Sequence, residues 1–416
     1  SPPRTVPVFT TLRLSGGIEF DCRVDRSVPV LAVAFTVSGG ATGESARDAG
    51  LSTLTQMAQV KGVNGLDAEA LYEALEGQGA ALSPLADRDY GGLVLTGLAD
   101  RMDAALDLTG RVIREPSFLN EEIEQEKRLA LEQLAAMADS PFQAASLELR
   151  RLVYGDHPYG RPLPGTPESL PGLGREDVFA RYLRAWNRNN IRVVASGDCD
   201  PEALAGRLEE ILAELPAETV SRRPDPGACR KPQGVEEVAV ERSQNQSVVL
   251  VGWPGPRDTE EHRVPLMLLK EILNGQSGRL FEELRNRRSL CYNTGVLSTA
   301  GFGQGMLVGY VLTAPDTADE ARTALVAELA KAAVTEPGDA EFERARTQLL
   351  GGLMISSQSN GSRVGRTLRD RVYGRGANDL EDLVRAIGLC TPDQVRAAAA
   401  TFVDPDHRFD VLLGPS

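Results

Sequence analysis

The same succession of strand and helix patterns occurs twice along the chain, and this repeat constrains the fold more than any other feature. A run of apolar residues at Leu31–Val37 is followed by two glycines, and a second run at Val248–Trp253 is followed by Pro-Gly. Each run is typical of a buried strand that ends in a turn. Phe35 and Leu250 then occupy equivalent places in the two strands, 215 residues apart.

Two helical segments repeat in the same order. A short amphipathic helix is predicted at residues 70–75 and its counterpart at residues 281–284, so that Leu75 and Leu284 correspond at an offset of 209. A longer helix begins at Asn120 in the first half and at Asp339 in the second, an offset of 219, and both residues are good helix N-caps. Three similar offsets indicate a duplicated domain. Two unrelated domains with ordinary helix caps are the alternative.

The length of 416 residues also favours two domains, because one ordinary hydrophobic core does not grow to that size. Residues 216–234 are rich in proline and glycine and lack apolar periodicity, which predicts a linker. The predicted domains are therefore residues 1–215 and 235–416. Strands and helices mix without the strict alternation of a parallel βαβ protein, so we expect α+β domains, each a mainly antiparallel sheet with helices packed on one face.

The net charge of −14 argues against a nucleic-acid groove and mildly favours basic or unfolded cationic partners, but a solubilising surface is the favoured explanation. No apolar run is long enough for a membrane span. We therefore expect a soluble protein and favour the cytoplasm. Export to the periplasm stays open, because Ser1 could follow a removed signal segment.

The five cysteines and three histidines are scattered along the chain. The cysteines form no Cys-x-x-Cys pair, which favours reduced, buried thiols over a disulfide framework or a structural zinc site. No two histidines lie four residues apart, so a helical two-histidine metal site cannot be built. These residues are Cys22, Cys199, Cys229, Cys291, Cys390, His157, His262 and His407.

The segment Gly50-Leu-Ser-Thr-Leu-Thr-Gln-Met57 resembles the zinc-binding helix of the pitrilysin/insulinase-type (M16) metallopeptidases, which include the mitochondrial processing peptidases. In that family the helix reads His-x-x-Glu-His: two histidines on one helical face bind zinc, and the glutamate activates the bound water as general base. The corresponding residues here are Thr53, Gln56 and Met57. The resemblance thus implies a catalytic helix without its metal ligands.

The family's third zinc ligand is a glutamate in a downstream helix that typically reads Val-Leu-Glu-Glu. Ala130-Leu-Glu-Gln133 matches this helix and places Gln133 in the ligand position, 76 residues after Met57. Gln133 lies beside the apolar stripe of its helix, so its side chain can face inward. The neighbouring Glu132 is a substitute in principle, but one carboxylate without two imidazoles would not hold catalytic zinc.

The altered residues are chemically consistent with loss of the metal site. Glutamine cannot act as a general base near neutral pH, and threonine and methionine are poor zinc ligands. We therefore expect no metal in this chain. A degenerate enzyme with a relocated metal is the alternative.

Three further segments resemble the same family, in the family's order, so the resemblance covers nearly the whole chain. It implies a processing-peptidase- or insulinase-like half-clamshell built from two homologous domains. His157, which lies in the first of these segments, is interpreted as a structural residue. The segments are Tyr154–Thr166, Ala185–Asp198 and Leu273–Arg285.

The family's second domain carries an arginine and a tyrosine seven residues apart, which Arg285 and Tyr292 match. In the family this pair faces the zinc across a cavity between the domains, holds the substrate backbone and stabilises the developing oxyanion. Arginine is a permanent cation with several N–H donors, and a tyrosine hydroxyl can donate to a charged tetrahedral oxygen. In isolation, the two residues would be read as a solvated helix residue and a packed strand residue.

The family's substrate-binding edge strand is altered as well. Gly79-Ala-Ala-Leu-Ser-Pro84 corresponds to a segment in which the family's catalytic subunits typically carry Asn, and Ser83 replaces it here. Pro84 removes a backbone donor that the addition of a peptide strand would use. We therefore expect weakened peptide binding by this half of the chain.

Together these features predict a division of labour between two chains. The resemblance implies that this chain is a non-catalytic, substrate-binding subunit, inactive alone, that supplies Arg285 and Tyr292 to the active site of a homologous zinc-bearing M16 subunit for peptide-bond hydrolysis. The implied assembly is a heterodimer, alone or within a higher assembly, with zinc in the partner and a peptide or unfolded protein as substrate. A purely structural scaffold with no role in proteolysis is the alternative.

Overall fold

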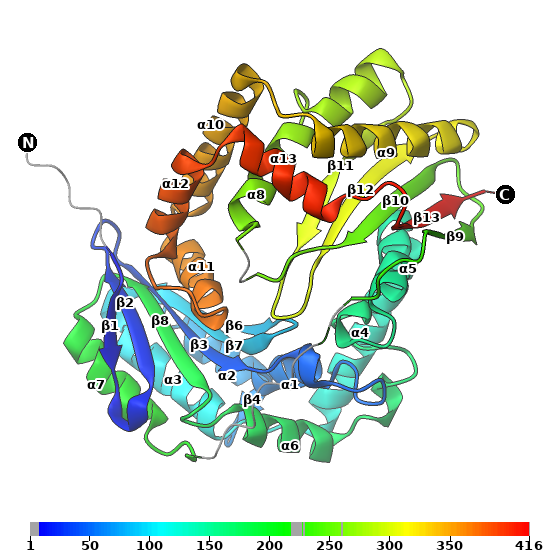
Figure 1. Cartoon of the computed structure of the whole chain (residues 1–416). Helices are drawn as coiled ribbons and strands as arrows, with labels where there is room; N and C mark the ends of the chain where they lie inside the picture. Colours follow the sequence, from blue (N-terminus) through cyan, green and yellow to red (C-terminus); the bar gives the residue numbers. More distant parts are fainter. Residues whose placement is uncertain (1–7, 218–226, 228, 259–260, 416) are drawn as a thin grey trace, which may run out of the picture. The chain divides into compact units, whose positions relative to one another are not determined.

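The computed structural model describes residues 8–217, 227, 229–258 and 261–415 of the chain (Figure 1). These residues form two compact units, and each unit contains segments from both halves of the sequence. The first comprises Ser1–Leu134, Pro162–Pro224 and Ser356–Leu380, and the second comprises Ala135–Arg161, Asp225–Ile355 and Glu381–Ser416. Within the described ranges, no helix is long and apolar enough to cross a membrane.

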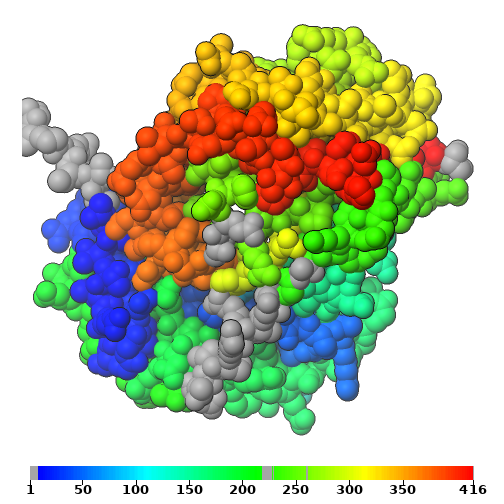
Figure 2. Space-filling model, viewed as in Figure 1, coloured from blue at the N-terminus to red at the C-terminus, as the bar shows by residue number. Residues whose placement is uncertain are grey.

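The sheet of the first unit has six strands in the order β1-β2-β8-β3-β7-β6. All neighbouring strands are antiparallel except β2 and β8, which are parallel. Strand β1, mostly exposed, forms one edge and lies at the surface in Figure 2 (dark blue). The strands are β1 (Thr10–Arg13), β2 (Glu19–Val24), β3 (Val30–Ser38), β6 (Ala80–Ala86), β7 (Tyr90–Leu98) and β8 (Ile191–Gly197), and a small hairpin, β4 (Gly62–Val63) and β5 (Leu66–Asp67), lies apart from the sheet.

The sheet of the second unit has five strands in the order β11-β12-β10-β13-β9. Only β13 and β9 are parallel. This pair lies beside the central strand β10 as the parallel pair β8 and β2 lies beside β3 in the first sheet. The strands are β9 (Val235–Glu241), β10 (Ser247–Pro254), β11 (Asn293–Thr299), β12 (Met306–Thr313) and β13 (Arg408–Gly414).

The strand registers confirm the predicted duplication. Phe35 in β3 pairs with Leu93 of β7 and Val193 of β8. Leu250 in β10 pairs in the same way with Tyr310 of β12 and Val411 of β13. The predicted fold class is therefore correct: the chain forms two homologous α+β domains, each with a mainly antiparallel sheet.

The helices begin where the sequence provides caps. Asp67, Asp200 and Thr391 each accept a backbone hydrogen bond in the first turn of the following helix. Proline follows Asp200 and Thr391 at the first helical position, where its missing N–H has no intrahelical partner to lose. The helices of the first unit are α1 (Leu51–Gln59), α2 (Ala68–Glu76), α3 (Met102–Arg114), α4 (Asn120–Asp139), α6 (Arg175–Ala185), α7 (Pro201–Leu212) and α11 (Asn360–Val372).

The second unit follows the same plan with one local difference. Residues 281–284, predicted as a short α-helix, belong instead to a wider π-helical turn at Phe281–Arg287. The Arg288 N–H accordingly donates to the carbonyl of Glu283, five residues earlier, at 3.2 Å. The helices are α5 (Pro141–Tyr154), α8 (Arg263–Leu273), α9 (Ala318–Val334), α10 (Asp339–Ser356), α12 (Asp379–Leu389) and α13 (Pro392–Phe402).

Each sheet is covered on its second face by a helix from the other half of the sequence. Helix α11 packs on β3 and β8, and helix α5 packs on β10 and β13. In β3, alternate residues such as Val33 face the main core, whereas Ala32 and Ala34 face α11. The predicted ranges 1–215 and 235–416 follow the duplication along the sequence. In the packed units, the segment with α5 joins the second unit and the segment with α11 joins the first. Most of the predicted linker, residues 218–226 and 228, lies outside the described residues.

The two exchanged helices are attached by different chemistry. Helix α5 uses apolar contacts: Leu149 and Val153 are buried against a cluster that includes Leu250 and Phe409. Helix α11 adds charged contacts, because the Arg371 guanidinium binds the carboxylates of Asp21 and Glu19, each at 2.8 Å. Ion pairs thus help to select the sheet that α11 covers, whereas apolar packing selects the sheet that α5 covers.

Candidate functional site

The start of helix α1 is tightly built. Gly50 has φ of +91°, and a Cβ at this position would lie 2.5 Å from the Pro164 carbonyl oxygen, so the position requires glycine. The buried Glu44 carboxylate accepts hydrogen bonds from the backbone N–H groups of Gly50 at 2.8 Å and Ser52 at 2.6 Å. Burial raises the pKa of Glu44 above its usual value. Helix α1 is therefore held firmly at its N-terminus.

The three residues of helix α1 that the sequence analysis placed at the family's metal-site positions have ordinary packing roles. The Thr53 hydroxyl donates to the Leu163 carbonyl at 2.7 Å. Gln56 is buried, and its side chain lies over Gly91 of β7, where a Cβ would come 2.9 Å from the Gln56 Nε2 atom. Met57 is half-buried. Their positions provide no imidazole and no carboxylate.

Helix α4 follows the predicted stripe, but Gln133 does not face inward. Ile123, Lys127 and Leu134 are buried, whereas Gln133 and the adjacent Glu132 are exposed. Gln133 directly precedes Leu134, which belongs to the buried stripe. One residue along an α-helix corresponds to a rotation of about 100° around the helix axis, so the two side chains point in different directions.

The donor set at these positions does not suit zinc. In the described part of the chain, no group of three or more His, Cys, Asp or Glu side chains could hold a metal ion. Threonine, methionine and amide side chains do not replace the nitrogen, sulfur and carboxylate ligands that zinc sites use. No chemical step through a metal bound at Thr53, Gln56, Met57 and Gln133 is therefore derived for this chain.

Arg285 and Tyr292 are brought into direct contact. The Arg285 guanidinium donates a hydrogen bond from Nη1 to the Tyr292 carbonyl at 2.9 Å and lies over the Phe281 ring, 4.9 Å from its centroid. The Tyr292 side chain is 60% exposed. Among the residues that the structure describes, no carboxylate forms an ion pair with Arg285. The pair thus presents a phenol hydroxyl and an uncompensated cation on one exposed turn.

The turn that carries this pair is fixed by backbone contacts. The Leu290 N–H donates to the Leu284 carbonyl at 2.7 Å, and the Leu290 carbonyl accepts from the Thr313 hydroxyl at 2.5 Å. The Tyr292 N–H donates to the Leu312 carbonyl of β12 at 2.8 Å. Ser289 adopts a positive φ of 53°, which the following turn requires. The π-helical turn and β11 therefore meet at a defined angle around the pair.

The other arginines of this basic turn are already engaged. Arg287 pairs with Glu282 at 3.4 Å and with Glu283 at 3.3 Å, and Arg288 pairs with Glu320 at 2.8 Å. Sequence alone could not separate these three arginines by their surroundings, because two of the compensating carboxylates come from the same turn and one from α9.

Asn274 is a residue of the site that the sequence reasoning missed. Its side-chain amide donates to the Val296 carbonyl at 2.9 Å and accepts from the Val296 N–H at 2.6 Å. The amide therefore occupies the free edge of β11 as a neighbouring strand would. Gly295 leaves room for it, since a Cβ there would lie 2.8 Å from the Asn274 Oδ1 atom. The only sequence signal was its place in the Leu273–Arg285 segment.

The corresponding edge of the first sheet, β6, is formed as predicted around Ser83 and Pro84. Hydrogen bonds join Leu98 to Gly79 at 3.4 Å and Asp87 to Tyr90 at 2.9 Å. In this antiparallel register, Pro84 lies opposite Leu93. Because hydrogen-bonded positions alternate along the strand, the nitrogen of Pro84 points to the open edge and removes one donor from it.

His157 has the surroundings of a structural residue. Its Nδ1 atom accepts a hydrogen bond from the Tyr159 N–H at 3.0 Å, and its ring stacks on Tyr154 with centroids 5.6 Å apart. These contacts stabilise the turn that follows helix α5 and agree with the role inferred from the sequence.

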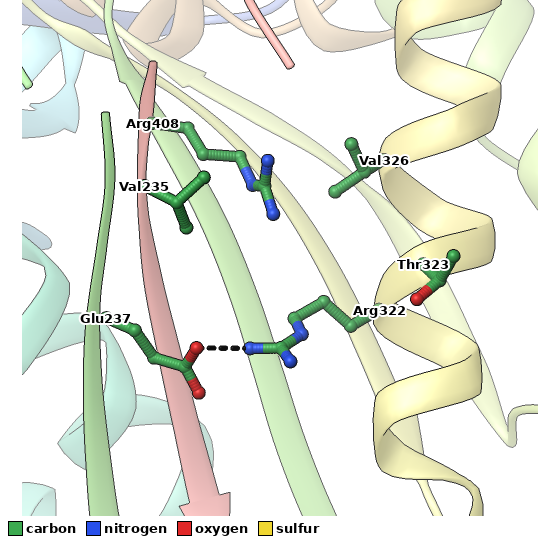
Figure 3. A pocket seen from close by; sticks show the side chains of 6 residues that line it. All are labelled: Val235, Glu237, Arg322, Thr323, Val326 and Arg408. Atoms are coloured by element: carbon green, nitrogen blue, oxygen red, sulfur yellow. Dashed lines mark ion pairs between the residues drawn. The ribbon is translucent and has the colours of Figure 1, made fainter. Parts of the chain in front are cut away.

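A cavity of about 240 Å³ lies in the second unit between helix α9 and strands β9 and β13 (Figure 3). Arg322 points across it and pairs with Glu237 at 2.6 Å. Arg408 binds the buried Asp410 carboxylate at 3.0 Å. Each of these cations is thus matched by an acid, and the cavity lacks a free charge of its own for a ligand.

Comparisons with known proteins agree with this architecture. The sequence model of insulinase, peptidase family M16, matches residues 23–167, and the model of the peptidase M16 inactive domain matches residues 172–349. The two models thus divide the chain as two domains of one family.

Relatives with zinc-protease names are similar over almost their whole length. An uncharacterized zinc protease of Mycobacterium tuberculosis is 27% identical over 412 residues, covering 97% of this chain and 92% of the relative. An uncharacterized zinc protease of Mycobacterium leprae is 25% identical over 405 residues, covering 97% and 91%.

Solved structures share the fold at lower identity. A peptidase M16 inactive domain from Pseudomonas fluorescens has a TM-score of 0.91 at 22% identity, covering 98% of each chain. A protease from Helicobacter pylori has a TM-score of 0.90 at 17% identity, covering 99% of this chain and 100% of the other. The chain, with both domains matched in order, belongs to peptidase family M16, the insulinase family.

Proposed function

We propose that this chain is the non-catalytic, substrate-binding subunit of a heterodimeric M16 zinc peptidase. The observation that carries the proposal is the contrast between two sites. Arg285 is held against the Tyr292 carbonyl without an ion-pair partner among the described residues, and the Tyr292 side chain is exposed. The positions of the family's zinc ligands instead hold Thr53, Gln56 and Met57.

The Arg–Tyr pair suits the charge that develops during peptide hydrolysis. Attack of water on an amide carbonyl produces a tetrahedral oxyanion, which fixed donors stabilise more strongly than they stabilise the substrate carbonyl. A guanidinium can donate several N–H groups, and a phenol can donate one O–H to such an oxygen. The hydrogen bond from Arg285 to the Tyr292 backbone carbonyl reduces the number of orientations that the Arg285 side chain must lose on binding.

The proposed partner is a homologous M16 chain that retains His-x-x-Glu-His and binds zinc. The zinc-protease names of the relatives support peptide hydrolysis as the reaction of the assembly. Zinc on the partner supplies the activated water, and Arg285 and Tyr292 of this chain bind the substrate backbone and the oxyanion. A peptide or unfolded protein is the proposed substrate.

The test uses this chain mixed with the His-x-x-Glu-His homologue encoded in the same genome. We expect little peptidase activity from either chain alone and clear activity from the mixture. Tyr292→Phe and Arg285→Gln should each lower kcat about 10²- to 10³-fold, the usual loss for one oxyanion donor. Arg287→Gln is the matched control, because that residue is already paired with Glu282 and Glu283. Unchanged activity of the mixed complex in both variants would refute the proposal.

A structural scaffold is the second candidate function, favoured by the outward-facing Pro84 on the open edge of β6. A scaffold would be purified from its native source with membrane or assembly partners and without a zinc-bearing homologue. Co-purification of that homologue in equal amounts would instead support the peptidase subunit.

A further inference from the structure

Two of the five cysteines lie side by side in the first unit although 177 residues separate them in the sequence. The Sγ atoms of Cys22 and Cys199 are 3.7 Å apart, and both residues are free thiols. The other three thiols, Cys229, Cys291 and Cys390, belong to the second unit. The scattered spacing in the sequence had not indicated any pair.

The sheet topology creates this proximity. Strands β2 and β8 run parallel, with Cys22 opposite Ala195 and Val24 opposite Gly197. After β8 the chain turns back toward helix α7, and Cys199 lies in this turn, packed against the same core as Cys22. The backbone on both sides is held: the Asp25 N–H donates to the Gly197 carbonyl at 2.8 Å.

The two thiols differ in access and in acidity. Cys22 is 2% exposed, whereas Cys199 is half-buried and directly precedes Asp200, the N-cap of α7. The hydrogen bond from the Cys22 thiol lowers the pKa of Cys199, and the same contact raises the pKa of Cys22. The carboxylates of Asp198 and Asp200 partly oppose the effect on Cys199. Cys199 is therefore the thiol that an oxidant reaches first and that ionises first.

We propose that Cys22 and Cys199 form a redox-modification site that closes to a reversible disulfide in the folded protein. This inference is independent of the proposed peptidase function. The sulfur atoms need to approach by about 1.7 Å to reach the S–S bond length of about 2.0 Å. A small-molecule disulfide such as oxidised glutathione is the oxidant.

The reaction proceeds in two exchange steps. The Cys199 thiolate attacks one sulfur of oxidised glutathione, forming a mixed disulfide and releasing one glutathione thiolate. Cys22 then loses its proton and attacks the Cys199 sulfur, which releases the second glutathione thiolate. In total, the two cysteines lose two electrons and two protons, and one oxidised glutathione is reduced to two glutathione molecules.

The cross-link would join β2 to the segment between β8 and α7. Because it would close a very long loop, it should restrict the unfolded chain strongly and raise the thermal midpoint of the first unit. Redox conditions would in this way change the stability of the unit that carries the degenerate zinc helix.

The test is peptide mapping of the folded full-length chain. Reduced protein is incubated with oxidised glutathione well below its unfolding temperature, remaining thiols are alkylated, and the protein is digested with trypsin without reduction. We expect a disulfide between tryptic peptides 14–23 and 193–207, its loss on treatment with dithiothreitol, and an increase of several degrees in the thermal midpoint.

Two variants serve as controls. Cys199→Ser should abolish the cross-link and the thermal shift, while Cys390→Ser should keep both. The proposal is overturned if the folded wild-type chain yields both peptides unlinked or if glutathione stays attached to Cys199. It is also overturned if the cross-link forms only in protein that has been unfolded.

Discussion

The ion pairs that hold helix α11 on the first sheet allow a quantitative prediction. Asp21 is 0% exposed; its Oδ2 atom accepts from Arg371 Nε at 2.8 Å and its Oδ1 atom from the Thr11 hydroxyl at 2.6 Å. Arg371 also binds Glu19 at 2.8 Å. In the Arg371→Met variant, Asp21 keeps its hydroxyl contact but loses its direct ion-pair partner, while Arg192 keeps its pair with Glu19 at 2.8 Å and still attracts the Asp21 charge from a greater distance.

Removal of one partner of a buried pair costs about 3–5 kcal/mol, chiefly because the remaining charge stays desolvated. We expect Arg371→Met to destabilise the first unit by this amount. Arg26→Met is the matched control in the same unit, since Arg26 forms an exposed pair with Asp198 at 3.5 Å, and such pairs contribute at most about 1 kcal/mol.

The two tryptophans make the assay specific for each unit. Trp186 is buried in the first unit and Trp253 in the second. In a Trp253→Phe background, urea unfolding followed by fluorescence reports on the first unit alone. A loss below about 1 kcal/mol in Arg371→Met, equal to that of Arg26→Met, would refute the reasoning that Asp21 depends on this guanidinium.

Three other predictions use the same fluorescence assays. Burial raises the pKa of Glu44 in the folded protein above its value in the unfolded chain, so the contribution of Glu44 to folding stability is most favourable at low pH and is lost as the pH rises through the folded pKa. The stability of wild type relative to Glu44→Gln should therefore increase from pH 7 to pH 4.5, and a decrease would contradict this sign. Gly252→Ala should destabilise the second unit by about 1–3 kcal/mol, since its Cβ would lie 2.9 Å from Leu149, and an unchanged urea midpoint would show that α5 can move away. Asn274→Ala should cost the second unit about 1–3 kcal/mol by leaving the buried Val296 backbone unpaired, and a neutral result would show that water replaces the amide.

Much of the fold could be predicted because the local pattern of apolar residues shows which strands and helix faces are buried. The apolar run at Leu31–Val37 lies within β3, and Asn120 and Asp339 are the first residues of α4 and α10. The registers around Phe35 and Leu250 agree because both runs are central strands, whose two neighbours are also buried.

The exchange of α5 and α11 could not be predicted from the sequence. A helical pattern shows that one face is buried, but it does not say which sheet covers that face. The contacts that decide it join residues hundreds of positions apart, such as Arg371 and Asp21. The pairing of Cys22 with Cys199 has the same origin, since it depends on the parallel alignment of β2 with β8.

In the candidate site, the contact between residues close in sequence could be predicted. Arg285 and Tyr292 are seven positions apart, and one tight turn joins them. The position of Gln133 beside the apolar stripe allowed an inward orientation, but Gln133 is exposed whereas the neighbouring Leu134 is buried. Its place was inferred from a resemblance of four residues, and side-chain direction on a helix changes with every residue.

The central claim is that Tyr292 of this chain donates to the oxyanion formed on a zinc-bearing partner. The most direct measurement is the inhibition constant of a phosphinic peptide, whose tetrahedral oxygens imitate that oxyanion, against the mixed complex. The account predicts that Tyr292→Phe weakens this inhibitor about 10²-fold or more while binding of the matching amide substrate changes far less. Equal inhibition of the wild-type, Tyr292→Phe and Arg287→Gln complexes would contradict it.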